Sequence, residues 1–239
     1  MRNLTRALLT ICLMTPLTGN TQTHPYIRLT TGLSFALASH NQTANFSSSY
    51  WKSLVSNSDT DPALYGGLSA GLRIPLTATL AAEVGVGAYQ AENYTPSGKV
   101  YQYSSPEFYN MNYRYNIHHQ RLMLEGKLLA TCATIYHPYI SAGLGVSHNR
   151  SDTYQELPIQ GFAVPDLPFS SASQNSLSYA LGVGVDIDVT NHWRLGAGYE
   201  LIDLGKTKLG GSPAQQTPQP IFTDRMKANQ FMLQATYAS

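Results

Sequence analysis

Two residues near the middle of the chain, His119 and Ser147, have side chains that together could carry out nucleophilic catalysis. A histidine beside a serine can remove the hydroxyl proton and so generate a nucleophile. The two residues lie on consecutive segments of alternating polarity, and antiparallel pairing about their short link would bring position 119 roughly opposite 147 and 148. His119 and Ser147 would then share the polar face, while His148 would lie on the other. This pair is the sharpest catalytic suggestion in the sequence.

A second chemical feature is a set of charged side chains near the middle of the polar faces of such segments. Five basic residues match five acidic ones: Arg28, Arg73, Arg121, Lys127 and Arg194 against Glu83, Glu125, Asp186, Asp188 and Glu200. Opposite charges in a narrow interior could form an ion pathway, or they could neutralise one another as a salt-bridged plug. We expect the plug. No metal-ligand spacing, phosphate loop or nucleotide motif is visible, so no metal and no cofactor are expected.

The elements that must position these residues are β-strands. After the first 22 residues no segment has helical periodicity, whereas alternation with a period of two recurs eight times. In the clearest case Leu177, Leu181 and Val185 alternate with polar or small residues. Each segment is about 10 residues long, as a tilted strand crossing a bilayer requires. The segments are 27–37, 64–74, 80–89, 119–128, 140–147, 177–188, 193–201 and 230–237.

The connections between these segments are alternately long and short. The long ones are 40–63, 90–116, 149–176 and 202–229, and the short ones are 75–79, 130–139 and 189–192. In an up-and-down meander all four long connections emerge at one end. This asymmetry is typical of an outer-membrane barrel with long extracellular loops and short periplasmic turns. The sequence therefore predicts an all-β fold, an eight-stranded antiparallel up-and-down transmembrane β-barrel.

Alternation alone does not show whether the apolar face points to lipid or to the cavity of a soluble barrel. Only 12% of the residues are charged, against about 25% in ordinary soluble domains. The polar face is rich in Gly and Ser, which leaves room inside a narrow barrel. Aromatic residues recur near strand ends on the apolar face, as in the interfacial girdles of membrane barrels. These residues are Phe35, Trp193, Tyr199, Phe231 and Tyr237.

The N-terminal residues have the pattern of an export signal. Arg2 and Arg6 precede an apolar stretch from Ala7 to Leu17 that is too short to span a membrane. We expect a signal peptide over about residues 1–22 and the barrel domain over 23–239. Removal of the signal peptide would leave 13 basic and 14 acidic residues, a balance that does not suggest a nucleic-acid partner. It would also remove Cys12, so that Cys132 could form no intramolecular disulfide.

The chain resembles the small eight-stranded outer-membrane barrels of the OmpA/OmpX and opacity-protein type. The resemblance covers the whole chain after the signal and depends on strand number, loop asymmetry, the Gly-rich strands SAGLRI, EVGVGAY, SAGLGVS, ALGVGVD and LGAGYEL, and the final strand FMLQATYAS. It implies the outer membrane of a bacterium, contact with outer-membrane lipid and lipopolysaccharide, and insertion by the barrel-assembly machinery. Such barrels usually end on an aromatic residue, whereas this one ends on Ser239. The peptidoglycan-binding domain of longer relatives is not expected.

Outer-membrane lipid A deacylases use Ser and His in a comparable setting. Here the sequence reads VSHN instead of the deacylase-like His-x-Ser arrangement. We therefore expect no catalysis and interpret His118, His119 and His148 as polar rim residues.

The long connections are the expected carriers of function. They contain clustered aromatic residues, which suit either a binding surface or packing of the loops on themselves. The Pro-rich connection 210–220 is expected to be extended and mobile. The leading hypothesis is a non-enzymatic surface barrel with a structural, adhesion or host-contact role, and a ligand bound through the loops. A lipid A-modifying enzyme and a small pore are the alternatives. The aromatic residues are Tyr50, Trp51, Tyr101, Tyr103, Phe108, Tyr109, Tyr113 and Tyr115.

Overall fold

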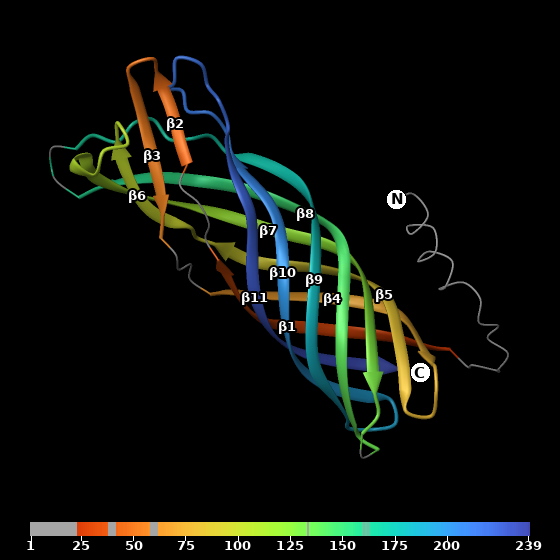
Figure 1. The fold of residues 1–239 in the computed structure, drawn as a ribbon. Coiled ribbons are helices and arrows are strands. Elements are labelled where there is room, and N and C mark those ends of the chain that lie inside the picture. Colours follow the sequence, from red (N-terminus) through yellow and green to blue (C-terminus); the bar gives the residue numbers. More distant parts are fainter. Residues whose placement is uncertain (1–22, 38–41, 58–61, 133, 160, 162) are drawn as a thin grey trace, which may run out of the picture.

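The described part of the chain is built almost entirely of antiparallel β-strands (Figure 1). The computed structural model describes residues 23–37, 42–57, 62–132, 134–159, 161 and 163–239; the expected signal peptide lies outside them. Within these ranges eight strands form a closed ring: β1 (His24–Leu37), β4 (Ala63–Pro75), β5 (Leu80–Tyr94), β7 (Tyr109–Ala130), β8 (Tyr136–Pro158), β9 (Ala172–Asp188), β10 (Trp193–Leu209) and β11 (Ile221–Ala238).

The ring closes because the first and last strands pair along their whole shared length. In this seam Tyr26 lies opposite Ala238 and Leu37 opposite Lys227. Each other strand pairs with the next barrel strand in the chain, including β7 with β8. A closed ring leaves no strand edge unpaired. The predicted eight-stranded antiparallel up-and-down barrel is therefore confirmed.

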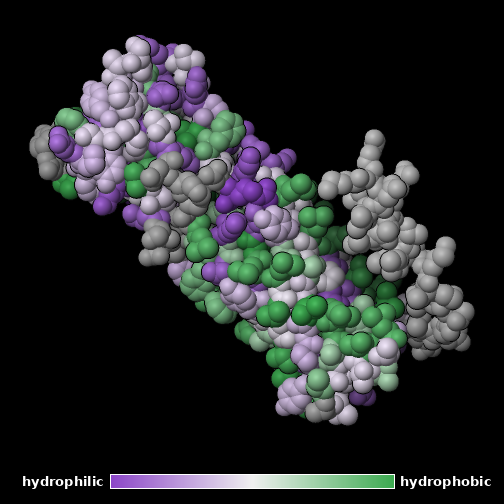
Figure 2. All heavy atoms as spheres, viewed as in Figure 1, coloured by the Kyte–Doolittle hydropathy of each residue, from purple (hydrophilic) through white to green (hydrophobic). Residues whose placement is uncertain are grey.

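The outer surface of the ring is apolar and its inner surface is polar. On β9, Leu177 and Leu181 are 63% and 62% exposed, whereas the inward Ser178 and Asp186 are buried. Apolar residues gather over the barrel, and polar ones over the opposite end (Figure 2). No helix in the described residues is long and apolar enough to cross a membrane. Outward apolar residues of the other strands include Ile27, Leu29, Leu68, Leu72, Val86, Leu124, Ile140, Leu144, Leu195 and Leu233.

Several strands continue beyond the predicted segments, and their polarity inverts where they do. On β7, the outward Leu122 and Leu124 are followed at the long-loop end by the outward Gln120 and His118. Over the same stretch the inward side changes from the charged Arg121 to the buried apolar Ile117, Tyr115 and Tyr113. In the barrel the outward face of β7 is therefore apolar, whereas at the long-loop end its inward face is apolar. For this reason the predicted strand ends at 89, 147 and 201 were too early, and the predicted strand start at 119 was too late.

Above the ring, three shorter strands extend the sheet from the upper part of β7. These are β2 (Gln42–Ser47), β3 (Tyr50–Ser56) and β6 (Ser97–Gln102), with a 3-10 helix η1 (Pro106–Phe108) between β6 and β7. The sheet order is β2-β3-β6-β7, so the first two long connections form one sheet with the upper part of β7. We call this sheet, the upper part of β8 and the connections 163–171 and 210–220 the cap (Figure 1).

The inside of the cap holds the apolar core of the molecule. Tyr154 stacks on Tyr113 with ring centroids 6.1 Å apart and meets Phe169 edge-on at 4.9 Å. Phe46 of β2 meets the same Phe169 at 5.9 Å. Each fully buried aromatic side chain contributes about 2 kcal/mol. The cap is therefore a folded unit with its own core.

The connection 210–220 packs against two other connections. The Ser212 hydroxyl donates to the Leu167 carbonyl oxygen at 2.6 Å, and the Gln216 backbone N–H donates to the Phe46 carbonyl oxygen at 2.9 Å. The Gln215 side chain donates to the Asn45 carbonyl oxygen at 2.9 Å. The expectation of an extended Pro-rich loop was wrong. Buried polar side chains anchor this segment between its turns, and composition alone does not reveal such partners.

Candidate functional sites in the lumen and the cap

The charged residues inside the barrel form ion pairs at several levels, the lowest of which centres on Glu83. The Glu83 carboxylate accepts hydrogen bonds from Arg28 and, at 3.3 Å, from Arg194 Nη1. Arg194 Nε also donates to Asp188 at 2.8 Å. Arg28, Glu83 and Arg194 are all buried, because β1, β5 and β10 direct them inward. A buried carboxylate between two guanidinium groups is well compensated.

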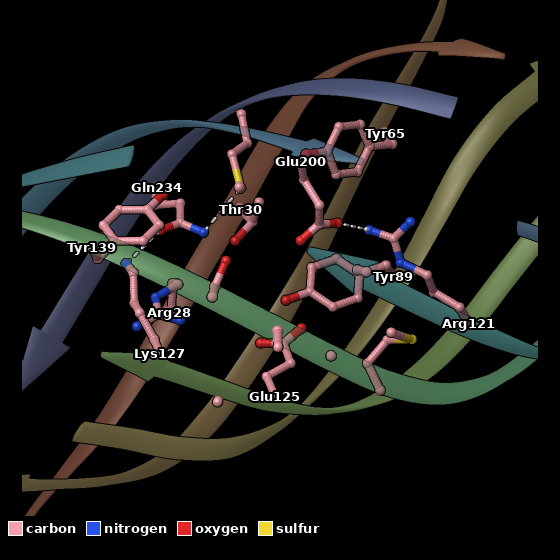
Figure 3. Close-up of a pocket in the computed structure, with 17 residues that line it drawn as sticks. Arg28, Thr30, Tyr65, Tyr89, Arg121, Glu125, Lys127, Tyr139, Glu200 and Gln234 are labelled. Atoms are coloured by element: carbon pink, nitrogen blue, oxygen red, sulfur yellow. Dashed lines mark hydrogen bonds and ion pairs between the residues drawn. The ribbon is translucent and has the colours of Figure 1, made fainter. Parts of the chain in front are cut away.

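Lys127 of β7 forms the next level, in the middle of the lumen. Its ammonium group lies 2.8 Å from Asp186 Oδ2 and 2.9 Å from Gln234 Oε1. It also lies 3.6 Å from the centre of the Tyr139 ring, in a cation–π contact. Figure 3 shows Lys127 and Tyr139 from neighbouring strands pointing toward each other.

Arg121 occupies the level closest to the cap. Its Nη2 donates to Gln230 at 2.9 Å and lies 3.5 Å from Glu200 Oε1. Its guanidinium carbon is 4.7 Å from the centre of the Tyr89 ring and 5.6 Å from that of Tyr65 (Figure 3). The aromatic faces take the place of water around a charge that has few other partners.

Two of the ten predicted lumen charges lie outside these ion pairs. Arg73 is half-buried beside Glu83 in the register, without an ion pair to a described carboxylate. Glu125 lines the central cavity, as Tyr89 does. Arg73, Arg194 and Asp188 lie next to the short turns, so placing all ten charges near mid-strand was wrong.

Side chains fill the lumen almost completely. The space left between Arg28, Glu125, Lys127 and Glu200 is a cavity of about 30 Å³ (Figure 3). A water molecule needs at least about 10–15 Å³ of such space, so the cavity has room for two. The described side chains therefore leave little free space in the middle of the barrel.

His119 and Ser147 face inward as predicted, but each side chain is hydrogen-bonded to a different residue. In the register His119 lies opposite Asn149, and Ser147 lies opposite Arg121. His119 Nδ1 is 2.6 Å from Asn149 Oδ1, while the Ser147 hydroxyl donates to the Ser176 carbonyl oxygen at 3.3 Å. The predicted partners of His119, Ser147 and His148, lie two residues and one residue before the observed partner, Asn149.

The cap contains an ion cluster that sequence reasoning missed. Lys52 of β3 is completely buried, and its ammonium group lies 2.7 Å from Glu156 Oε2 and 2.8 Å from Asp166 Oδ2. The Tyr50 hydroxyl donates to Asp166 at 3.1 Å, and the Tyr154 hydroxyl donates to Glu156 at 3.2 Å. Burial, reinforced by Asp166, raises the pKa of Tyr50, which therefore remains a donor. This cluster joins the first and third long connections.

The outer side of the cap carries an exposed group of aromatic side chains. Tyr103 and Phe108 are 45% and 47% exposed, and Trp51 is half-buried. Tyr103 meets Trp51 at 5.8 Å and Phe108 at 5.9 Å, both nearly edge-on. Tyr103 and Ser104 have φ of 54° and 55°, a conformation that costs about 1–2 kcal/mol for each such residue. We call Trp51, Tyr103 and Phe108 the aromatic surface. The aromatic residues of the long connections thus fall into two groups. Tyr103 and Phe108 are exposed, as a binding surface requires, whereas Tyr113 and Tyr115 are buried in the cap core, as packing of the loops on themselves requires.

The family of the chain follows from comparison with known proteins. The model of the outer membrane protein beta-barrel domain matches residues 4–238. The chain belongs to this family. It is therefore an outer-membrane β-barrel. Outer membrane protein PagN of Salmonella typhimurium is 32% identical over 108 residues, or 44% of each chain. The chain thus spans about half the length of the curated relative it matches.

Two solved structures are similar to this outer-membrane barrel. Neisserial surface protein A has 14% identity and a TM-score of 0.49, over 89% of this chain and 96% of that one. Ail, the attachment invasion locus protein of Yersinia pestis, has 13% identity and a TM-score of 0.36, over 90% and 98%. Ail has also been crystallised with the heparin analogue sucrose octasulfate.

The predicted interfacial aromatic residues of this outer-membrane barrel lie in two groups. Phe231 contacts Phe35 at 6.0 Å and Tyr199 at 5.2 Å toward the cap, while Trp193 and Tyr237 contact each other at 5.3 Å near the short turns. Tyr237 lies opposite Ile27. The nine residues of β1 from Ile27 to Phe35, which are eight steps along the strand, span about 27 Å. A tilt of about 40° reduces this to about 20 Å of height, close to the apolar band of such barrels.

Proposed function

We propose that this barrel is a non-enzymatic surface-binding protein, whose cap faces away from the cell and presents the aromatic surface to a ligand on another cell. The observation that carries the proposal is the exposure of Tyr103 and Phe108, beside the half-buried Trp51, on a cap that the Lys52 ion cluster ties together. Exposed aromatic residues on a fixed scaffold are typical of binding hot spots, because little conformational entropy is lost on binding. The strained turn at Tyr103 supports the same interpretation, since unfavourable backbone conformations cluster at functional sites.

The orientation follows from the asymmetry of the connections. The short turns suit the periplasmic side and the cap the outer side. Phe231, Leu233, Ala235 and Tyr237 keep the alternation expected for insertion by the barrel-assembly machinery, which we include in the proposal.

Replacing the aromatic surface should abolish attachment without unfolding the barrel. We expect the triple variant Trp51→Ala, Tyr103→Ala, Phe108→Ala, displayed on a non-adherent bacterial strain, to bind cultured epithelial cells at least about tenfold less, because each lost hot spot costs 1 kcal/mol or more. Adherent bacteria are counted after washing. Val164→Ala combined with Leu167→Ala, at exposed apolar positions elsewhere on the cap, is the matched control.

Point variants test this proposal better than loop deletions. Deleting the second and third connections would also remove Glu156 and Asp166, and with them the partners of Lys52. Heated and unheated gel mobility of the triple variant should match that of the unsubstituted protein. Attachment that is unchanged in a correctly folded triple variant contradicts the assignment to the aromatic surface.

The absence of catalysis is a second expected result. His119→Ala and Ser147→Ala should leave the mass spectrum of lipid A unchanged in cells that express the protein, because His119 and Ser147 bind different partners. The comparison strain expresses no such barrel. A lipid A species present with the unsubstituted protein and lost in either variant would instead establish a lipid-modifying enzyme.

A further inference from the structure

Four polar side chains form a continuous row on the outside of the barrel, at the level where the strands change polarity. Gln90, Gln120, His148 and Asn175 are successive partners in the registers of β5, β7, β8 and β9. All four are exposed, and His148 Nδ1 is 2.7 Å from Asn175 Oδ1. We call these residues the polar row. A row of amide and imidazole groups offers both donors and acceptors to a partner outside the barrel.

An apolar groove of about 790 Å³, open to the surroundings, lies directly against the polar row. Its walls are formed by the next row of outward-facing residues toward the short turns, two positions along each strand. These residues are Leu68, Ala88, Leu122 and Val146. Gly66 lies beside Gln90 in the register and deepens the groove, because it has no side chain. The groove and the polar row together have the shape of an apolar slot with a hydrogen-bonding upper edge.

The other side of the barrel lacks this combination in the described residues. At the corresponding level of β1, β10 and β11 the outward side chains include Phe35, Tyr199 and Phe231, which pack on one another. A second outward groove, of about 610 Å³, lies among Val84, Leu128, Ile140 and Leu181. It lies deeper in the apolar band and has no exposed polar row along its edge.

We propose that the polar row and its groove bind one lipopolysaccharide molecule of the outer leaflet, with the sugar headgroup on the row and one acyl chain in the groove. The proposal rests on the cap-outward orientation, which places the row at the outer interface. Sugar hydroxyl and amide groups match the donors and acceptors of Gln90, Gln120, His148 and Asn175. The next outward pair, His118 and Arg150, shares the Asp152 carboxylate at 3.2 and 3.5 Å. Recognition therefore depends on hydrogen bonds and shape more than on net charge.

The position of Gly66 allows a direct test of the groove. A Cβ atom built there meets only the Thr30 carbonyl oxygen, at 3.5 Å, so a larger side chain fits the backbone. Gly66→Leu should fill the slot. Gly126→Leu fills the deeper groove instead and is the matched control, since a Cβ there meets only the Ala142 carbonyl oxygen at 3.9 Å.

The measurement is native mass spectrometry of the purified full-length barrel in detergent, titrated with deep-rough lipopolysaccharide or with phosphatidylethanolamine. The unsubstituted protein should retain one lipopolysaccharide in preference to phosphatidylethanolamine. We expect Gly66→Leu, and separately Gln90→Leu combined with Gln120→Leu, to weaken that binding at least about tenfold, the equivalent of two lost hydrogen bonds or more. Gly126→Leu should bind as the unsubstituted protein does.

The two variants keep the test decisive if one of them fails to fold, because Gln90 and Gln120 face outward and support no internal contact. Equal retention of phosphatidylethanolamine and lipopolysaccharide by the unsubstituted protein would overturn the proposal. Undiminished binding in both the groove and the row variants would do the same. Loss of attachment in the aromatic-surface variant with lipopolysaccharide binding intact would show that the two proposals stand separately.

Discussion

Replacing Lys52 with Met should release the cap from its closed arrangement while the barrel stays inserted. The substitution removes the ammonium group between Glu156 and Asp166, whose side chains are 2% and 31% exposed. Breaking a buried ion pair from one side costs about 3–5 kcal/mol, because the remaining charge is left uncompensated. The barrel ladder lies elsewhere and does not depend on this cluster. We therefore expect rapid proteinase K cleavage within 163–171 on whole cells, and an unchanged heat-dependent mobility of the barrel.

The control for this prediction is another lysine of the cap. Lys99 is exposed on β6 and lies 5.1 Å from the centre of the Tyr109 ring, so Lys99→Met should leave protease resistance nearly unchanged. Removing the two carboxylates as well, with Glu156→Gln and Asp166→Asn added to Lys52→Met, should restore much of the resistance. Equal cleavage of the Lys52 and Lys99 variants would show that the cluster does not hold the cap.

The ion cluster around Lys52 could not be predicted from the sequence. Lys52 is separated from Glu156 by 104 positions and lies on the inner side of a strand that is only seven residues long. Its alternation with Leu54, also buried, gives no sign that one inward position is charged. Nothing local in the sequence marks Glu156 and Asp166 as its partners.

The barrel itself was predictable because lipid imposes one rule on every strand. Leu177, Leu181 and Val183 must all be apolar to face a bilayer, and this requirement needs no knowledge of partners. The cap obeys the opposite rule, in which Tyr113, Tyr115 and Ile117 are buried inside and polar residues cover the outside. The alternation of apolar outward and polar inward residues therefore ends where β7 leaves the bilayer and enters the cap. The strand itself continues to Tyr109.

The lumen was predictable in part for a related reason. Alternation places Arg28, Arg121 and Lys127 on the inner face, but it does not determine which residues they meet across the barrel. Those pairs depend on strand tilt and stagger, which the hydropathy pattern does not contain. The inward tyrosines Tyr65 and Tyr89 were on the expected face, yet their contact with Arg121 required the closed ring.

The second large effect should follow from neutralising Glu83, the carboxylate shared by Arg28 and Arg194. Among the described residues Arg28 has no other ion-pair partner, and its remaining side-chain hydrogen bond is to Thr236 at 3.1 Å. Glu83→Gln would leave that buried guanidinium uncompensated, at a cost of about 3–5 kcal/mol. We expect this loss in the free energy of unfolding, measured by urea titration of the barrel in lipid vesicles with tryptophan fluorescence.

Asp188→Asn is the matched control, because it removes the other carboxylate partner of Arg194 at a site where the Asp188 side chain is 35% exposed. Water can replace the lost partner there, so the cost should be about 1 kcal/mol or less. The double variant Arg28→Met, Glu83→Met should be more stable than Glu83→Gln, since removing both charges of a buried pair leaves none unpaired. Equal losses for Glu83→Gln and Asp188→Asn would mean that water reaches the lumen charges freely. The lumen would then be a hydrated passage, and single-channel recordings of the unsubstituted barrel should show steady conductance in place of the closed plug expected here.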